Sequence, residues 1–249
     1  MSSITEEMLK NFADRGRGYV EEGERPCAVS CDALGFGQVA EESDLPESPT
    51  LDQGQESSCL AHAYPDAFLV GALVQGVVNA RLFSRQYLYH YGRPDKNLDA
   101  GMSFANADKA LEEHGLPDER HWPYSDKEAF TSPPAKAIQN AVDQKGLFRS
   151  HPLAGSYDVL RSLSSGRPCI VGLKKTFGGP HAVMICGHRR NPITKEFELK
   201  IKNSWGIFFG DNGYIWLPAS LLDDPNEQIG IRSIDYTPSP SEDYAHETA

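Results

Sequence analysis

The sequence predicts an α+β protein of two lobes, in which a helical lobe comes first and an antiparallel β lobe follows. Two observations predict this order. Before residue 168 apolar residues recur at helical spacing in several segments, and after it short β-type runs are separated by turn residues. Helices followed by strands are typical of an α+β protein, and the cleft between two lobes is a common place for a ligand site.

The helices of the first half are predicted by their apolar spacing and their end signals. The long apolar run that begins at residue 59 is typical of a buried helix, and Pro65 should fix its start or kink it. Ser103 is an N-cap candidate for a later helix, and Gly115 is its stop signal. We expect helices over 4–15, 59–83, 84–92, 103–114, 133–146 and 156–166, and an extended segment over 41–50.

The strands of the second half are short runs rich in β-branched, aromatic and other apolar residues. Clusters of Gly, Pro, Asn and Asp separate them, as is usual between antiparallel strands. We expect strands over 168–174, 181–188, 196–203, 213–218 and 229–236.

The composition excludes some classes of partner. The 249 residues carry a formal net charge of −11 with a pI of about 5.2, and an acidic surface argues against a nucleic-acid partner. The N-terminus lacks a basic region followed by an apolar core, so we expect no secretory signal. No apolar run reaches the roughly 20 residues that a membrane span requires, so we expect no membrane partner.

The cysteines are odd in number and irregularly spaced, which is a poor framework for disulfides and suits a reducing, cytoplasmic compartment. Cys27 and Cys31 form a C-x3-C pair, but no second pair with zinc spacing is near them. We therefore expect free thiols and neither a metal nor a cofactor.

One cysteine stands where chemistry is expected. A thiol attacks a carbonyl as the thiolate, which a helix N-terminus and a neighbouring histidine both stabilise. Cys59 stands where the long apolar helix begins, His181 opens an apolar strand after a Gly-Gly-Pro turn, and Asn203 ends another strand. Each of these residues taken alone is more often structural than catalytic, so the combination carries the hypothesis.

The combination resembles a known family. Gln53, Cys59, the "HAV" that begins at His181 and the "KNSWG" around Asn203 occur in the order found in the papain-like (C1-type) cysteine peptidases. The resemblance covers roughly residues 45 to 236. It implies a papain-like two-lobed fold, with a helical lobe, an antiparallel β-barrel-like lobe and an active-site cleft between them.

The same resemblance suggests how the chain is divided. We expect an N-terminal extension over 1–44, with a short helix and a linker that could cap the cleft. A papain-like catalytic domain would follow over 45–236, and a polar, disordered tail would end the chain over 237–249.

The resemblance also implies catalytic roles. Cys59 would be the nucleophile, and His181 the general base and acid. Asn203 would hold the imidazole in its reactive tautomer, while Gln53 would donate its side-chain amide, with the Cys59 backbone N–H, to the oxyanion. Trp205 would cover the His–Asn hydrogen bond beside the substrate.

Two segments would line the substrate groove, according to the same resemblance. Gly101, Met102 and Ser103 would meet the backbone of a bound peptide on one side. Gly179 and Pro180 would line the other side.

Some residues depart from the family pattern. Glu56 replaces a cysteine of a structural disulfide, Leu60 replaces a tryptophan, and Phe209 stands where a second tryptophan is common. A carboxylate pointing toward the thiolate would oppose ionisation of the thiol, so we expect Glu56 to face solvent or a backbone donor. His62 shares a helix face with Cys59, and we expect it to pack or to line the site rather than to catalyse.

Three functions agree with these residues. The first is a bacterial, cytoplasmic thiol peptidase that cleaves peptide or amide bonds through a Cys59 acyl-enzyme. The second is an acyltransferase, or amide-forming biosynthetic enzyme, that passes the same acyl group from a peptide, amide or thioester to an amine. The third is a non-catalytic binding module of the same fold.

Overall fold

The computed structural model describes residues 4–16, 18–20 and 28–238. Cys27 lies outside these residues, as does all of the expected disordered tail except residues 237 and 238. Within them the helices are α1 (Glu6–Asn11), α2 (Cys59–Val74), α3 (Arg85–Gly92), α4 (Phe104–His114), α5 (Ala135–Asp143) and α6 (Ser156–Ser164), with short 3₁₀ turns η1 (Glu119–His121), η2 (Asp126–Glu128) and η3 (Ala219–Asp223).

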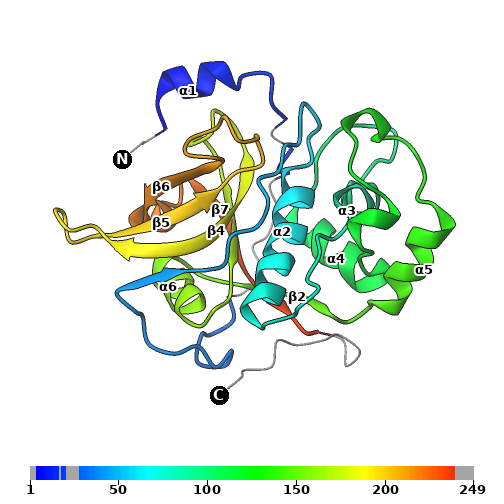
Figure 1. Cartoon of the computed structure of the whole chain (residues 1–249). Coiled ribbons are helices and arrows are strands. Elements are labelled where there is room, and N and C mark those ends of the chain that lie inside the picture. Colours follow the sequence, from blue (N-terminus) through cyan, green and yellow to red (C-terminus); the bar gives the residue numbers. More distant parts are fainter. Residues whose placement is uncertain (1–3, 17, 21–27, 239–249) are drawn as a thin grey trace.

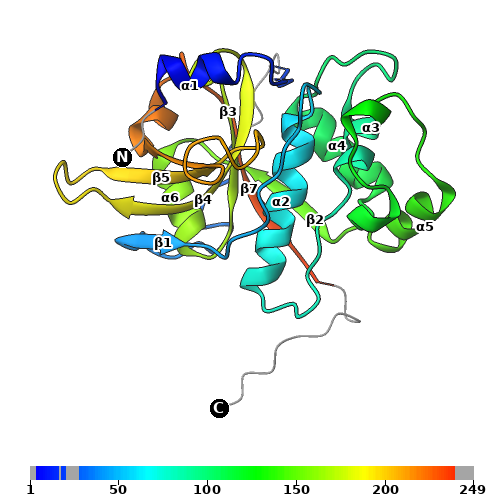
Figure 2. The same ribbon diagram turned by 45° about the horizontal axis from the view of Figure 1, so that its top comes forward.

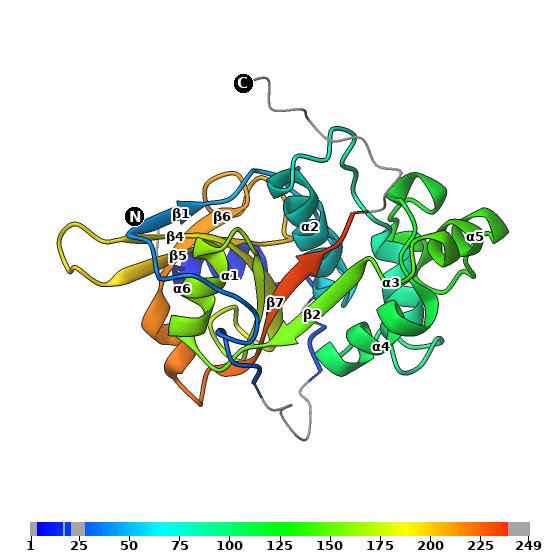
Figure 3. The same cartoon turned by 90° about the horizontal axis from the view of Figure 1, so that it is seen from below.

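A seven-stranded antiparallel sheet forms the β lobe (Figure 1). Its strands are β1 (Glu42–Asp44), β2 (Phe148–Pro152), β3 (Cys169–Leu173), β4 (His181–Arg190), β5 (Phe197–Lys202), β6 (Tyr214–Pro218) and β7 (Gln228–Tyr236). The order is β2-β7-β3-β4-β5-β6, and β1 pairs with the far half of β4. Seen from below, β7 and β2 run side by side beneath α2 toward the helical lobe (Figure 3).

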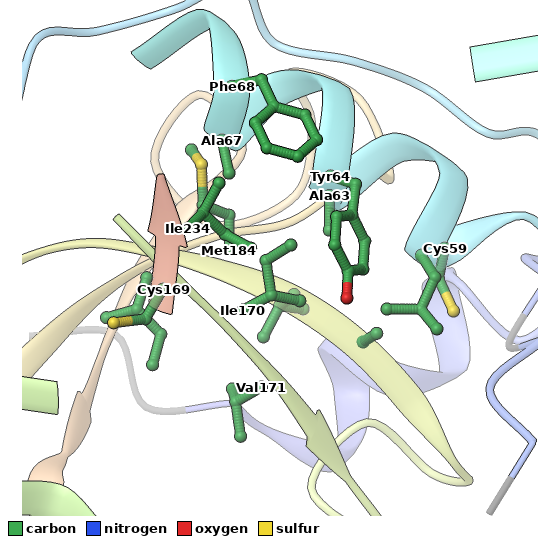
Figure 4. Packing of buried hydrophobic residues seen from close by; sticks show 14 of the residues in the cluster. Cys59, Ala63, Tyr64, Ala67, Phe68, Cys169, Ile170, Val171, Met184 and Ile234 are labelled. Carbon is green, nitrogen blue, oxygen red and sulfur yellow. The ribbon is translucent and has the colours of Figure 1, made fainter. Parts of the chain in front are cut away.

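The helix α2 joins the two lobes. Its buried Ala63 and Ala67 lie on the side of Ile170 and Met184 of the sheet (Figure 4). Phe68 packs on Phe148 of β2, with ring centroids 4.8 Å apart. Because the sheet and the helices α3 and α4 cover it on several sides, the helix is apolar almost throughout, as the long apolar run predicted.

Pro65 does not mark the start of α2. The helix begins at Cys59 and continues through the proline. A proline inside a helix removes one backbone hydrogen bond, and the packing of α2 against both lobes keeps the helix intact at this point.

The end signals of α4 act as the sequence predicts. Ser103 is its N-cap and forms a capping box with Asn106. Gly115 ends the helix with φ +71°, a backbone conformation that glycine adopts without strain.

Two strands precede residue 168: β1 lies within the extended segment expected over 41–50, whereas β2 was not predicted. Both are short, and both carry exposed or half-buried polar residues instead of an apolar run. They form because their backbones pair with β4 and β7, a long-range contact that leaves no local signal in the sequence.

The N-terminal part of the chain crosses the β lobe before it passes between the lobes (Figure 2). Phe12, which follows α1, stacks on Trp205 with ring centroids 5.8 Å apart. Further along, the Arg161 guanidinium of α6 donates hydrogen bonds to the carbonyls of Phe36 and Gly37. The N-terminal extension is thus held on the β lobe both before and after the interlobe passage.

Candidate active site

Cys59 is the first residue of α2, with Ser58 as its N-cap. In Figure 4 its thiol lies at the N-terminal end of the helix, apart from the core side chains further along. Four backbone N–H groups, those of Ala182, Leu60, Cys59 itself and Gly18, lie at the sulfur and lower the pKa of the thiol. Complete burial outweighs them and raises this pKa to about 11.

His181 and Asn203 meet at the start of β4 and the end of β5. The pairing of the two strands sets Met184 beside Lys202, so the two ends lie at the same edge. Nε2 of His181 is 2.8 Å from Oδ1 of Asn203. An amide oxygen only accepts, and this one also accepts from the Ser204 N–H at 2.8 Å. Nε2 therefore carries the proton, and Nδ1 is the basic nitrogen of the ring.

Aromatic rings enclose this imidazole. Trp205 lies 4.8 Å from His181 between ring centroids, and Phe177 lies 5.0 Å from it. Phe209, which stands where a second tryptophan is common in the family, packs on Trp205 with ring centroids 5.3 Å apart. All four side chains are fully buried, so the His–Asn hydrogen bond is shielded from water.

Gln53 is fixed by several hydrogen bonds. Its Oε1 accepts from the Ser204 hydroxyl at 2.6 Å, and its Nε2 donates to the Glu56 carbonyl at 2.8 Å. The same Nε2 donates to the carbonyl oxygen of Gly16 at 3.0 Å. The amide that was expected to hold an oxyanion therefore holds a carbonyl oxygen of this chain's own N-terminal extension.

That extension lies along the site. We call residues 15, 16 and 18–20 the strap. The Gly18 carbonyl accepts from Met102 N–H at 2.9 Å, and the Val20 N–H donates to the Met102 carbonyl at 3.0 Å, in a parallel bridge between Tyr19 and Met102. Gly101 has φ +73°, and a Cβ there would lie 1.7 Å from the Gly18 oxygen. The strap is therefore in close contact with the segment predicted to receive substrate.

The other predicted groove residues are placed less directly. Ser103 caps α4, as described above. Gly179 is half-buried and Pro180 is exposed in the turn before His181. Glu227 anchors this turn by accepting from the backbone N–H of Thr176 at 2.6 Å.

The expectation for Glu56 was wrong. The residue is 4% exposed, and its carboxylate meets neither solvent nor a backbone donor of the part of the chain that the structure describes. Burial raises the pKa of Glu56 to about 7, and the nearby hydroxyls of Ser58 and Tyr124 oppose this rise. The carboxyl is protonated over much of the range below neutral pH, which limits its repulsion of a thiolate.

His62 packs, as expected. Its Nδ1 lies 3.0 Å from the Ser58 carbonyl oxygen, and its ring meets Tyr124 edge to face at 4.5 Å. Burial lowers the pKa of His62 well below its usual value, so the ring is neutral. His62 is therefore a neutral, buried ring that packs in the first turn of α2.

Hydrogen bonds replace the family disulfide near Glu56. The Asp99 carboxylate accepts from the Ser57 N–H at 2.9 Å and from the Tyr89 hydroxyl. These bonds tie the loop before Cys59 to the segment before Gly101. Sequence reasoning missed this contact and also Tyr19, because both depend on pairings of residues far apart in the chain.

The described residues contain no group of three or more His, Cys, Asp or Glu side chains that could hold a metal ion. In the same part of the chain no helix is both long and apolar enough to cross a membrane.

Two lobes meeting at a helix-terminal cysteine and a strand-borne His–Asn pair define the papain-like class of folds. The chain resembles the papain-like (C1-type) cysteine peptidases in sequence and in structure. A curated relative, an uncharacterised peptidase C1-like protein of Acanthamoeba polyphaga mimivirus, is 27% identical over 209 residues. The match covers 71% of this chain and 66% of the relative, so it spans just under two thirds of the relative's length.

Solved structures agree on the fold. Xylellain, a cysteine protease from Xylella fastidiosa, is similar with a TM-score of 0.76 and 20% identity, over 90% of this chain and 97% of xylellain. The proform of the ragweed pollen cysteine protease Amb a 11 has a TM-score of 0.72 at 18% identity, over 92% of this chain and 77% of the allergen chain. Procathepsin L 3 of the Tenebrio molitor larval midgut has a TM-score of 0.67 at 20% identity, over 92% and 78% of the two chains. No protein-family model matches the chain.

Proposed function

We propose that this protein is a papain-like thiol peptidase that hydrolyses peptide bonds through an acyl-enzyme on Cys59. The observation that carries the proposal is the 2.8 Å hydrogen bond from Nε2 of His181 to Asn203, on the lobe that faces the helix-terminal thiol. It leaves Nδ1 as the ring nitrogen that can take a proton.

The reaction has two halves. The Cys59 thiol gives its proton to Nδ1 of His181, and the sulfur attacks the substrate carbonyl. The imidazolium then returns that proton to the leaving amine as the C–N bond breaks. In the second half the imidazole takes a proton from water, the hydroxide attacks the thioester, and the thiol is regenerated with release of the acid.

Gln53 would stabilise the charge that forms on the substrate oxygen. Its Nε2 already donates to a carbonyl oxygen, that of Gly16, at 3.0 Å. A substrate carbonyl that replaced the strap at this place would receive the same donor, and the bond from Ser204 keeps the amide oriented for it.

The form described here is latent in this proposal, because the strap buries the thiol. Two of the similar structures, procathepsin L 3 and Amb a 11, are also described as proforms, which supports the same reading of the N-terminal extension. We further propose that the protein acts in a reducing, cytoplasmic compartment. All the cysteines in the described part of the chain are free thiols, which agrees with this setting.

The test is mass spectrometry of a diverse peptide mixture incubated with Gly18→Ala, in which an added Cβ would lie 1.8 Å from the Ser57 carbonyl oxygen and so displace the strap, and with Gly18→Ala combined with Cys59→Ala, with a small amine in both. New acid termini with Gly18→Ala alone are the expected result. Termini capped by the amine would favour acyl transfer. Equal cleavage by both proteins would overturn the proposal.

A further inference from the structure

A small cavity lies between the first turns of α2 and the sheet. Its volume is about 10 Å³, which is near the lower limit for holding one water molecule. Its walls come from α2, from β4 and from the end of β5, and the residues that line it include His62 and Asn203. Asn203 therefore borders both the cavity and the His181 ring, to which it is hydrogen-bonded.

Two unpaired polar side chains line this cavity. Asn203 is 2% exposed and His62 is 1% exposed. Neither Nδ2 of Asn203 nor Nε2 of His62 has a hydrogen-bond partner among the residues that the structure describes. A buried polar group left unpaired costs more stability than an ordinary hydrogen bond contributes, so a shared partner in the cavity would stabilise the site.

The neighbours of these two atoms fix which one donates and which one accepts. Nδ1 of His62 lies 3.0 Å from the Ser58 carbonyl oxygen, which only accepts. Nδ1 therefore carries the proton of the neutral ring, and Nε2 is an acceptor. Oδ1 of Asn203 accepts from the Ser204 N–H at 2.8 Å, which sets the orientation of the amide and leaves Nδ2 as a donor. One donor and one acceptor are what a single bridging water requires.

The charged groups beside the cavity are already paired with each other. Asp66 and Lys202 also line it, and the ammonium of Lys202 lies 2.8 Å from the Asp66 carboxylate. The same ammonium donates to the carbonyl oxygens of Ser48 and Pro49 at 3.0 and 2.8 Å. Its three N–H groups are thus used, and this ion pair does not serve His62 or Asn203.

We propose that one buried water molecule bridges Nδ2 of Asn203 and Nε2 of His62, and that His62 is thereby a positioning residue for the His181 imidazole. The water accepts from Nδ2 and donates to Nε2. A chain of hydrogen bonds then runs from Nε2 of His181 through Asn203 and the water to His62, and ends at the Ser58 carbonyl, with donors and acceptors matched at every step. The inference rests on the proposed peptidase function.

The water affects His181 through the Asn203 amide. Hydrogen bonds in a chain polarise one another, so donation by Nδ2 makes Oδ1 a better acceptor for the His181 N–H. A better acceptor stabilises the imidazolium that forms when the Cys59 thiol gives up its proton. Without the acceptor on His62, the pKa of the His181 imidazolium should fall, and kcat should fall with little change in KM.

The first experiment tests the water itself. A high-resolution crystal structure of the full chain should show one water within hydrogen-bond distance of Asn203 Nδ2 and His62 Nε2, and a structure of His62→Phe should lack it. His62→Leu serves if His62→Phe does not fold. A wild-type structure without this water, or a water that stays in the same place in the variant, would overturn the inference.

The second experiment measures the pKa of His181 without catalysis. The protein carries Gly18→Ala and Cys59→Ala with labelled histidine, and the ring is titrated by NMR with and without His62→Phe. We expect His62→Phe to lower this pKa by about 0.5 pH unit, a shift within the range of one hydrogen bond. An unchanged pKa would overturn the positioning role.

The third experiment is kinetic and uses the Gly18→Ala background. His62→Phe should lower kcat by about 3- to 10-fold, the effect of one hydrogen bond, and should move the alkaline limb of kcat/KM to lower pH. His62→Gln, whose carbonyl oxygen can accept from the water, should recover most of the loss. His188→Phe is the matched control, because His188 is equally buried but lies 3.1 Å from the Ala40 carbonyl oxygen, away from the site.

The outcomes separate this inference from the proposed function. Peptide cleavage with the same kcat and pH profile in Gly18→Ala with and without His62→Phe would overturn the inference and leave the peptidase proposal standing. A loss that His62→Gln does not recover, or that His188→Phe reproduces, would also overturn it. If Gly18→Ala cleaves no peptide, the peptidase proposal fails, and the crystal structures and the His181 titration still decide whether the water is present and acts on His181.

Discussion

Gly18→Ala should release the strap from the thiol. A Cβ at this position would lie 1.8 Å from the Ser57 carbonyl oxygen and 2.3 Å from the Ser57 Cβ, and backbone cannot yield as a flexible side chain does. Overpacking of this kind costs about 1–3 kcal/mol, which shifts the balance between the covered and uncovered states by about 5- to 150-fold toward the uncovered one.

The release should change the chemistry of Cys59 as well as its exposure. Under the strap its pKa is about 11, against an ordinary value of 9.0. If uncovering returned the pKa of Cys59 to this ordinary value, the thiolate fraction at neutral pH would rise by about a hundredfold. The covered state binds the thiol proton more tightly than the uncovered one, so covering is favoured at low pH and is lost as the pH rises above the pKa of the uncovered thiol.

The assay is the rate of Cys59 alkylation by iodoacetamide between pH 6 and pH 10, read by peptide mapping so that the other cysteines are counted separately. The matched control is Gly37→Ala, on the same extension, where an added Cβ meets nothing within 4 Å. We expect faster alkylation and a lower pH midpoint for Gly18→Ala, and wild-type behaviour for the control. An unchanged rate and midpoint in a folded Gly18→Ala protein would refute the covering role of the strap.

Three further predictions concern the site and its support. Glu56→Gln should stabilise the protein above neutral pH by about 3 kcal/mol, because the folded-state pKa of about 7 exceeds the ordinary 4.5 and the wild-type protein therefore loses stability as the pH rises from 4.5 through 7. Urea unfolding at pH 5 and pH 8 checks this, with the exposed Glu112→Gln as control. An equal change in the free energy of unfolding between the two pH values in wild type and Glu56→Gln would contradict it. In the Gly18→Ala background, Gln53→Ala should lower kcat by about 10²–10³-fold with little change in KM. Ser204→Ala, which only removes the 2.6 Å hydrogen bond that orients Gln53, should lower kcat less. A larger loss of kcat with Ser204→Ala than with Gln53→Ala would argue against an oxyanion role for Gln53. Lys202→Met should destabilise the protein by about 3–5 kcal/mol, because it leaves the buried Asp66 carboxylate without the ammonium 2.8 Å away. The double variant Lys202→Met, Asp66→Leu should recover much of that loss in thermal unfolding. No recovery would mean that the two charges do not stabilise the fold as a pair.

The chemistry-bearing residues could be predicted because each stands in a local pattern. Cys59 begins an apolar run, and His181 and Asn203 flank predicted strands. That these residues lie close together in space was predicted from the family resemblance. The structure brings His181 and Asn203 within hydrogen-bond distance. Their catalytic roles stay predictions until the variants are assayed.

The contacts of the strap were not predictable in the same way. Gly18 contacts Met102, and Tyr19 contacts Gly172 and Gly230, all far away along the chain. Glycines in a linker usually mean only a turn or a flexible segment, and here they are required by close approach to another backbone. The burial of Glu56 was missed for a related reason, since a lone carboxylate in a loop is usually solvated.

Two contacts, one before and one after the strap, anchor it and determine how readily a substrate can displace it from the site. Phe12 on Trp205 holds the chain before the strap, and Arg161 on the carbonyls of Phe36 and Gly37 holds it afterwards. A segment tethered in this way binds as an intramolecular ligand, at an effective concentration of the order of millimolar. A free peptide of equal intrinsic affinity must reach that concentration to compete with it. A single cut on one side of the strap leaves the other anchor in place, so the enzyme would stay inhibited until both anchors are lost.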